Sequence, residues 1–173
     1  MYLNTNYQAS GVGALLNYIE KDRPLRNSAG REVTDREREN FIEKSERHRF
    51  ERELRISPDP AADVDRADLE RETERYLRDF TRDRPSVRAV YAYHTDAEHE
   101  HVHVALTGER RDLYLDREDL ERDRERLADR LERGRERTRD REPERDRELA
   151  RDVERKREQE QERERGRDLG IGR

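Results

Sequence analysis

The most regular pattern in the chain is a run of alternating polar and apolar residues that begins at His101. Val102, Val104 and Leu106 share one parity, whereas His101 and His103 share the other. Because successive side chains of a β-strand point to opposite faces, this period of two predicts a strand with one apolar face. The second face of the same strand would present two neighbouring imidazoles.

Other segments are also predicted to form strands. Residues 87–93 are rich in β-branched and aromatic side chains, follow Pro85 and lead directly into His94, which is typical of a strand. Residues 96–99 would then form the turn of a hairpin that joins this strand to the next one. The remaining predicted strands are residues 2–7, residues 50–57 and a short one over residues 112–116.

Helical spacing of apolar residues predicts the helices. Over residues 12–21 the apolar side chains recur at intervals of three, four and seven and form a single stripe. Thr34 is a favourable N-cap with Glu37 three residues later, which predicts a capping box and a helix that ends near His48. Two further helices are predicted to begin at Asp65 or Asp68 and at Asp116.

The order of these elements predicts an α+β fold. We expect a mostly antiparallel sheet with helices on one face and a site on the open face. Apolar residues become rare after about position 134, where Arg alternates with Glu and Asp. The sequence therefore predicts one domain over residues 1–133 and a highly charged, helical or disordered tail over residues 134–173.

Composition narrows the class of protein. Charged residues make up 49% of the 173 residues and hydrophobic residues 29%, so the core must be concentrated in part of the chain. The absence of cysteine excludes disulfides and thiolate ligands. Because the sequence has neither a membrane-spanning apolar run nor a signal-peptide pattern, we expect a cytoplasmic protein without membrane contact. The net charge of −5 argues against a simple basic nucleic-acid binder.

Histidine is concentrated in one place. Four of the five histidines lie between positions 94 and 103. In a hairpin, the end of the first strand lies beside the start of the second, so His94 can join His101 and His103 as a third metal ligand. Three imidazoles suit a divalent ion such as Mg, Mn or Zn and leave coordination positions open for a phosphate oxygen. The alternative is that these histidines are exposed strand residues without a ligand.

Tyr18 is a candidate functional residue on the first predicted helix. It lies about 110° from the centre of the apolar stripe, given 3.6 residues per turn. This position borders the buried face and leaves the hydroxyl free to reach outward. A structural tyrosine with a solvated hydroxyl is the alternative interpretation.

The histidine segment resembles a known motif. His94-x-Asp96-x-x-x-x-His101-x-His103 is similar to the third motif of conjugative relaxases, the mobilisation nucleases of the P type. These enzymes belong to the HUH endonuclease superfamily, in which two histidines flank a hydrophobic residue, here Val102.

Two further segments agree with this family in order and position. Residues 14–22 resemble its first motif, in which Tyr18 falls on the tyrosine that attacks DNA. Residues 55–58 resemble its second motif, in which Ser57 falls on the serine that contacts DNA near the nick. The resemblance covers roughly residues 1–130, and Thr107 stands where the family often has an asparagine.

The resemblance implies metal-dependent nicking and rejoining of one DNA strand at a plasmid or mobile-element origin. Tyr18 would form a phosphodiester with the 5′-phosphate and release a 3′-hydroxyl, while the histidine-bound metal polarises the phosphate. The acceptor of the tyrosine proton stays open between Asp96, His99 and a metal-bound water. Asp96 could instead orient a ligating histidine. Tyr2 and Tyr7 remain alternative nucleophiles.

The implied partner is single-stranded DNA at an origin of transfer, together with accessory mobilisation proteins. Arg23 and Arg88 are available for its phosphates, because the planar guanidinium bonds two oxygens at once, and Tyr91 and Tyr93 are available for stacking on its bases. Two other functions fit the same residues. One is a DNA-binding accessory or plasmid-maintenance protein that does not cut, and the other is a rolling-circle replication initiator.

Overall fold

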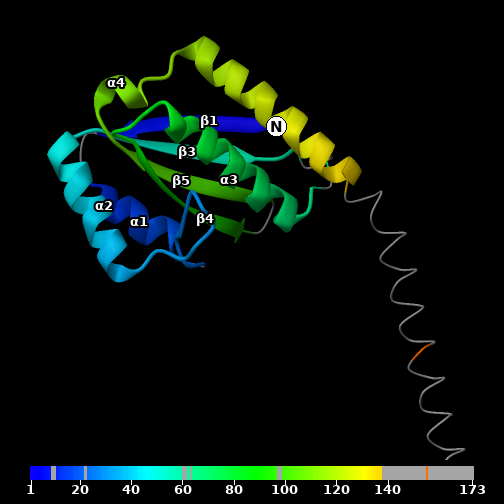
Figure 1. Cartoon of the computed structure of the whole chain (residues 1–173), viewed down its shortest axis with the longest axis horizontal. Coiled ribbons are helices and arrows are strands. Elements are labelled where there is room, and N and C mark those ends of the chain that lie inside the picture. Colours follow the sequence, from blue (N-terminus) through cyan, green and yellow to red (C-terminus); the bar gives the residue numbers. More distant parts are fainter. Residues whose placement is uncertain are drawn as a thin grey trace, which may run out of the picture. The chain divides into compact units, whose positions relative to one another are not determined.

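The computed structural model describes residues 1–8, 11–21, 23–59, 62, 64–96, 99–137 and 155, and Figure 1 shows the arrangement of their elements. The chain divides into two compact units, Met1–Gly134 and Arg135–Arg173. All of the labelled helices and strands belong to the first unit.

The first unit is built on a five-stranded sheet. The strands are β1 (Tyr2–Gln8), β2 (Arg26–Asn27), β3 (Glu51–Ser57), β4 (Arg88–Asp96) and β5 (His99–Thr107). Their order in the sheet is β1-β3-β5-β4-β2, and the neighbours in this order are antiparallel. The predictions of an α+β fold and of a mostly antiparallel sheet are therefore confirmed, and the β4–β5 hairpin lies in the middle of the sheet.

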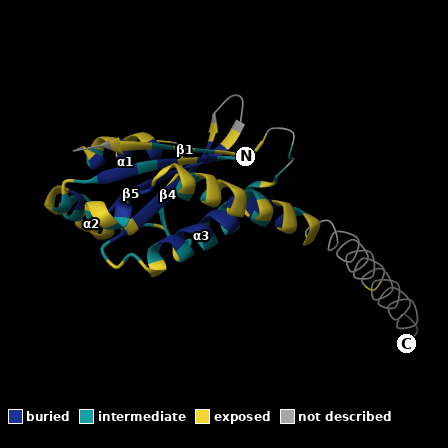
Figure 2. Cartoon of the chain, turned by 90° about the horizontal axis from the view of Figure 1, so that it is seen from above, coloured by how far each residue is buried: buried dark blue, intermediate teal, exposed yellow. Residues whose placement is uncertain are grey.

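Helices cover both faces of this sheet. They are α1 (Val12–Ile19), α2 (Asp35–His48), α3 (Arg66–Arg82), the short α4 (Arg110–Leu113) and a helix that begins at residue 117. Figure 2 shows α1 and α3 on opposite sides of the strands. Apolar residues of α1 and α2 share one core cluster, and those of α3 and of the helix after α4 share the other. Among the described helices, none combines the length and apolar character that a membrane crossing requires.

The prediction of helices on one face only is wrong. The central strands carry buried apolar residues on both sides: Val90, Ala92 and Ala105 pack in the cluster with α1, whereas Tyr91 and Val104 pack in the cluster with α3. A strand that is apolar on both faces needs a cover on both faces. The histidines share their face with Val90, Ala92 and Ala105. Because this face mixes histidines with small apolar residues, the sequence pattern did not indicate that it is buried.

The helices begin and pack as their sequences dictate. All four apolar residues of the α1 stripe are buried: Val12, Leu15, Leu16 and Ile19. α2 starts with a complete capping box, in which the Thr34 hydroxyl accepts from the Glu37 amide at 3.3 Å and the Glu37 carboxylate accepts from the Thr34 amide at 2.9 Å. The Asp65 carboxylate caps α3 by accepting from the amide of Asp68 at 2.7 Å.

The short strand predicted over residues 112–116 is absent from the described structure. Instead, α4 ends at Leu113 and the chain passes through Leu115 into the next helix. Both leucines are buried in the cluster with α3. Leu113 and Leu115 therefore fix a connecting segment to the core. Two buried residues separated by one exposed residue occur in such segments as well as in strands.

The capping box of α2 yields a first prediction. Replacing Thr34 by Ala removes the hydroxyl that satisfies a first-turn amide and should lower the free energy of unfolding by about 1 kcal/mol. Thr34→Ser keeps the hydroxyl and should leave stability nearly unchanged. Urea denaturation followed by circular dichroism measures both variants. An unchanged free energy of unfolding in Thr34→Ala would show that the cap does not stabilise the domain.

Candidate metal centre

The β4–β5 hairpin brings three histidines together. His94 and His101 are directly opposed in the antiparallel register, and His103 follows two residues later on the same face. All three side chains are buried, and one ring nitrogen from each lies within 4.8 Å of the others. The convergence that the sequence predicts is therefore present. Within the described part of the chain, these rings are the one group of at least three potential ligands close enough to hold a metal ion.

Hydrogen bonds from outside the hairpin orient two of these rings. Nε2 of His94 lies 2.6 Å from the carbonyl oxygen of Ile19, the last residue of α1. Nδ1 of His103 lies 2.8 Å from a carboxylate oxygen of Glu53 on β3. Because a carbonyl or carboxylate oxygen only accepts, these two nitrogens carry the proton in the neutral rings. The lone pairs are then on Nδ1 of His94 and on Nε2 of His103.

The donor set fits a divalent metal ion. Nε2 of His101 and Nε2 of His103 are 3.0 Å apart. Two nitrogens bound tetrahedrally at 2.0–2.1 Å from one ion would be separated by about 3.3 Å, so only a small adjustment is needed. Neutral imidazoles that donate their second N–H to a carboxylate or a carbonyl are also typical of ligating histidines.

Glu53 is a functional candidate that the sequence analysis missed. The hydrogen bond from His103 holds the pKa of the Glu53 carboxyl below its ordinary value, although partial burial acts in the opposite direction. Glu53 therefore stays ionised and suited to accept the imidazole N–H. Its parity, opposite to that of Leu54 and Ile56, places it on the face of the sheet that carries the histidines. The register of β3 against β5, which the sequence does not reveal, brings it to His103.

Tyr18 lies beside the three histidines. Its ring centroid is 5.4 Å from that of His103, in an edge-on arrangement, and 6.1 Å from that of His94, in a stacked one. The side chain is 54% exposed, whereas the histidines beneath it are buried. α1 thus places a solvent-accessible phenol at the entrance of the candidate metal centre.

Two residues of the Arg-Ile-Ser-Pro segment lie on the same face of the sheet. Arg55 is directly opposite His103 in the β3–β5 register and is exposed, so it adds a cation that the sequence analysis did not select. Ser57 is half-buried at the end of β3. Its parity places it on the face of Arg55, beside the start of β5. The predicted DNA-contacting serine is therefore near the histidines.

The other predicted residues are placed differently. Arg23 is exposed in the segment after α1. Arg88 lies at the far end of β4, six residues before His94 and roughly 20 Å away at about 3.3 Å per residue, so it is not part of the metal centre. Asp96 ends β4 opposite His99, but the side chains of both residues lie outside the described part of the structure.

The fold places the alternative nucleophiles, Tyr2 and Tyr7, farther from the histidines than Tyr18. Tyr7 belongs to the opposite face: its hydroxyl is 3.3 Å from the carbonyl oxygen of Leu115, and the guanidinium of Arg52 covers its ring at 3.8 Å. Tyr2 pairs with Ser57 on β1 and therefore shares the face of the histidines. It is two strands away from His101, roughly 10 Å across the sheet, whereas Tyr18 is in ring contact.

Inference about the function of this protein rests on the geometry of the site. No protein-family model matches the chain, and no curated protein matches it in sequence.

The hydrogen bond between Glu53 and His103 should affect how tightly the three histidines bind a metal ion. Removing the carboxylate in Glu53→Ala should weaken Mn²⁺ or Zn²⁺ binding by roughly 10–100-fold, because the ring loses its orienting acceptor. Glu53→Gln keeps an acceptor oxygen and should lose less. Isothermal titration calorimetry measures each affinity, with Glu43→Ala, an exposed change on α2, as the control. Unchanged affinity in Glu53→Ala would show that this contact does not support a metal ligand.

Proposed function

We propose that this protein is a metal-dependent nuclease that nicks and rejoins one DNA strand at a plasmid or mobile-element origin. Such an activity would make it a relaxase-like member of the HUH endonucleases. The observation that carries the proposal is the contact between an exposed tyrosine and three buried, convergent histidines. A nucleophile and a metal site are the two parts that reversible strand cleavage through a covalent intermediate requires.

The three histidines would hold a divalent ion, which when bound supplies a Lewis acid that polarises the scissile phosphate. Tyr18 provides the nucleophile: its oxygen forms a bond to phosphorus while the bond from phosphorus to the 3′-oxygen breaks. The phenolic proton leaves to an acceptor, and the released 3′-oxygen takes up a proton. Because one phosphodiester replaces another, the bond energy is retained and the reverse step rejoins the strand.

The neighbouring residues fit a DNA strand that lies across this face. Arg55, exposed and opposite His103, suits a phosphate next to the scissile one, since guanidinium binds two phosphate oxygens at once. Ser57 adds a hydroxyl, and Arg23 adds a second exposed cation beyond α1. This local positive charge explains how an acidic chain of net charge −5 could bind a polyanion at one face.

A trapping assay tests this function. Wild-type protein is mixed with Mn²⁺ and labelled single-stranded DNA from the origin of its own element, and the products are separated on a denaturing gel. We expect a band of protein joined covalently to DNA. Tyr18→Phe should abolish it because the nucleophile is lost, and His101→Ala should abolish it because a metal ligand is lost. Tyr114→Phe, which alters another exposed tyrosine, is the control and should retain the band.

Other outcomes separate the alternatives. A band that survives Tyr18→Phe and disappears in Tyr2→Phe would move the nucleophile to β1. If the wild-type protein binds the DNA but no variant or wild-type lane contains a covalent band, the nuclease proposal is wrong. The chain would then be a DNA-binding accessory protein that keeps the site without cutting.

A further inference from the structure

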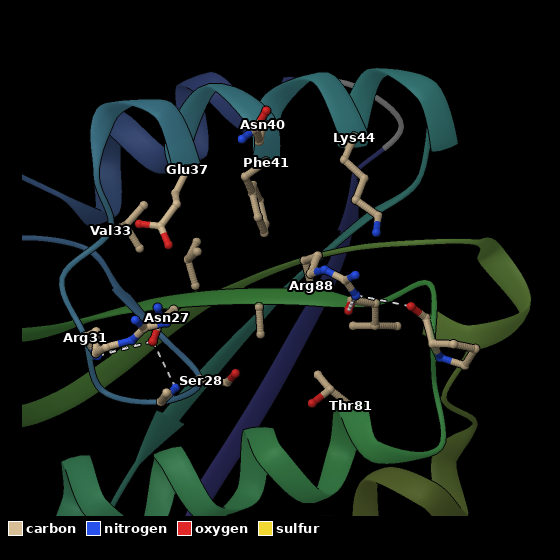
Figure 3. A pocket seen from close by; sticks show the side chains of 15 residues that line it. Asn27, Ser28, Arg31, Val33, Glu37, Asn40, Phe41, Lys44, Thr81 and Arg88 are labelled. Atoms are coloured by element: carbon tan, nitrogen blue, oxygen red, sulfur yellow. Dashed lines mark hydrogen bonds between the residues drawn. The ribbon is translucent and has the colours of Figure 1, made fainter.

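A second concave site lies away from the metal centre, at the outer edge of β4. It is a cavity of about 550 Å³, within the roughly 300–1,000 Å³ typical of small-molecule sites. Figure 3 shows α2 above it, the end of α3 below it and the β2 hairpin at one end. β2 covers the edge of β4 only at Val90 and Tyr91, so the earlier residues of β4 line the opening.

One end of the cavity carries two cations. Lys44 and Arg88 both line it, and Figure 3 shows the Lys44 ammonium pointing toward the Arg88 guanidinium. Among the described residues, neither side chain forms an ion pair. Burial and the nearby charge of Arg88 lower the pKa of Lys44. Two unpaired cations that face each other across a cavity repel, and an anion between them would remove that repulsion.

Arg88 is already oriented for such an anion. Its Nη1 donates to the carbonyl oxygens of Pro85 at 3.1 Å and Val87 at 2.8 Å. These two bonds fix the guanidinium at the wall of the cavity, while its remaining nitrogens have no partner among the described residues. A planar guanidinium held in this way presents two parallel N–H groups, the geometry that a phosphate accepts.

The rest of the cavity differs in character from the cationic end. Glu37, Asn40, Phe41 and Lys44 recur on α2 with the spacing of one helix face, and all four line the cavity. Glu37 lies about 10 Å along the helix axis from Lys44. Its carboxylate, bonded to Thr34, excludes a second anion from that end. Between these charges Phe41 adds an apolar surface to the wall, although its side chain is only 5% exposed. Asn40 is exposed on the same face of α2, so this part of the cavity suits a flat ring with polar groups at its rim.

We propose that this cavity binds one nucleotide of a single-stranded DNA, with its phosphate between Lys44 and Arg88 and its base against Phe41. The Asn40 amide offers one donor and one acceptor to the edge of the base. Unpaired nucleotides are commonly held by a cationic site for the phosphate next to an apolar or aromatic wall for the base, and here the exposed part of Phe41 belongs to that wall. The inference rests on the proposed function, since it takes the strand cut at Tyr18 as the source of the nucleotide.

The position of the cavity is compatible with binding of the same DNA strand that Tyr18 would cut. Arg88 and His94 are on the same strand, roughly 20 Å apart, so a strand that reaches from one site to the other would span a few nucleotides. The cavity would thus anchor the DNA at a distance from the scissile phosphate. Anchoring of this kind fixes which phosphate reaches Tyr18 without adding a group to the chemistry itself.

Fluorescence anisotropy with the labelled single strand used for trapping tests the inference. The double variant Lys44→Gln/Arg88→Gln should bind about ten-fold more weakly. The slope of log K against the logarithm of the salt concentration should become shallower by about 0.7 for each lost phosphate contact. Asn40→Ala should weaken binding without changing the salt dependence, because it removes a base contact only. Arg36→Gln/Arg117→Gln removes the same charge from exposed positions that do not line the cavity and should bind as the wild type does.

The results separate this inference from the nuclease proposal. If wild type shows no covalent band but binding still depends on Lys44 and Arg88, the cavity inference stands and the nuclease proposal fails. If trapping succeeds while the Lys44→Gln/Arg88→Gln variant binds DNA as tightly as wild type, the cavity inference is overturned. A cavity that binds free dAMP or inorganic phosphate through these cations, but leaves DNA binding unaffected, would also overturn it.

Discussion

The register of the β4–β5 hairpin is the constraint on which the site depends. His94 and His101 are directly opposed, so both imidazoles leave the sheet on the same side, and His103 is added by the period of two. A slip of one residue would send the histidines of one strand to the other face. Burial on both faces prevents this slip. Tyr93 and Val102 pack on the α3 side, and Ala92 and Ala105 pack on the α1 side. A slip would therefore bury imidazoles in the α3 cluster and force larger side chains into the space that these alanines leave beneath α1.

The packing of α1 connects this hairpin to Tyr18, the proposed nucleophile. The helix leaves the carbonyl oxygen of Ile19 at its C-terminal end, where such groups lack a partner within the helix, and His94 binds it at 2.6 Å. The preceding residue is Tyr18. One helix end therefore orients a candidate ligand and presents the exposed phenol next to it. Burial of Leu15 and Leu16 holds this geometry in place, which makes the site a product of the core on the histidine face.

Local patterns predict much of this structure. The hairpin, its three histidines and the position of Tyr18 follow from periodicity and short-range spacing, and the α2 capping box follows from Thr34 and Glu37. The second layer of helices was not predicted, because small residues such as Ala92 and Ala105 resemble a solvent-facing row until a helix is seen above them. Glu53 and Lys44 could not be found from the sequence either. Their roles depend on the β3–β5 register and on how α2 packs over β4. Both arise from contacts between residues that are far apart in the sequence.

The central claim is that His94, His101 and His103 hold one metal ion beneath Tyr18. Anomalous diffraction from crystals soaked in Mn²⁺ measures this directly, because it locates the metal independently of any activity. We expect one strong anomalous peak about 2.0–2.3 Å from a ring nitrogen of each of the three histidines, with the Tyr18 ring beside it. Full occupancy at another position, or no peak between these rings at saturating Mn²⁺ and the same result with Zn²⁺, would contradict it.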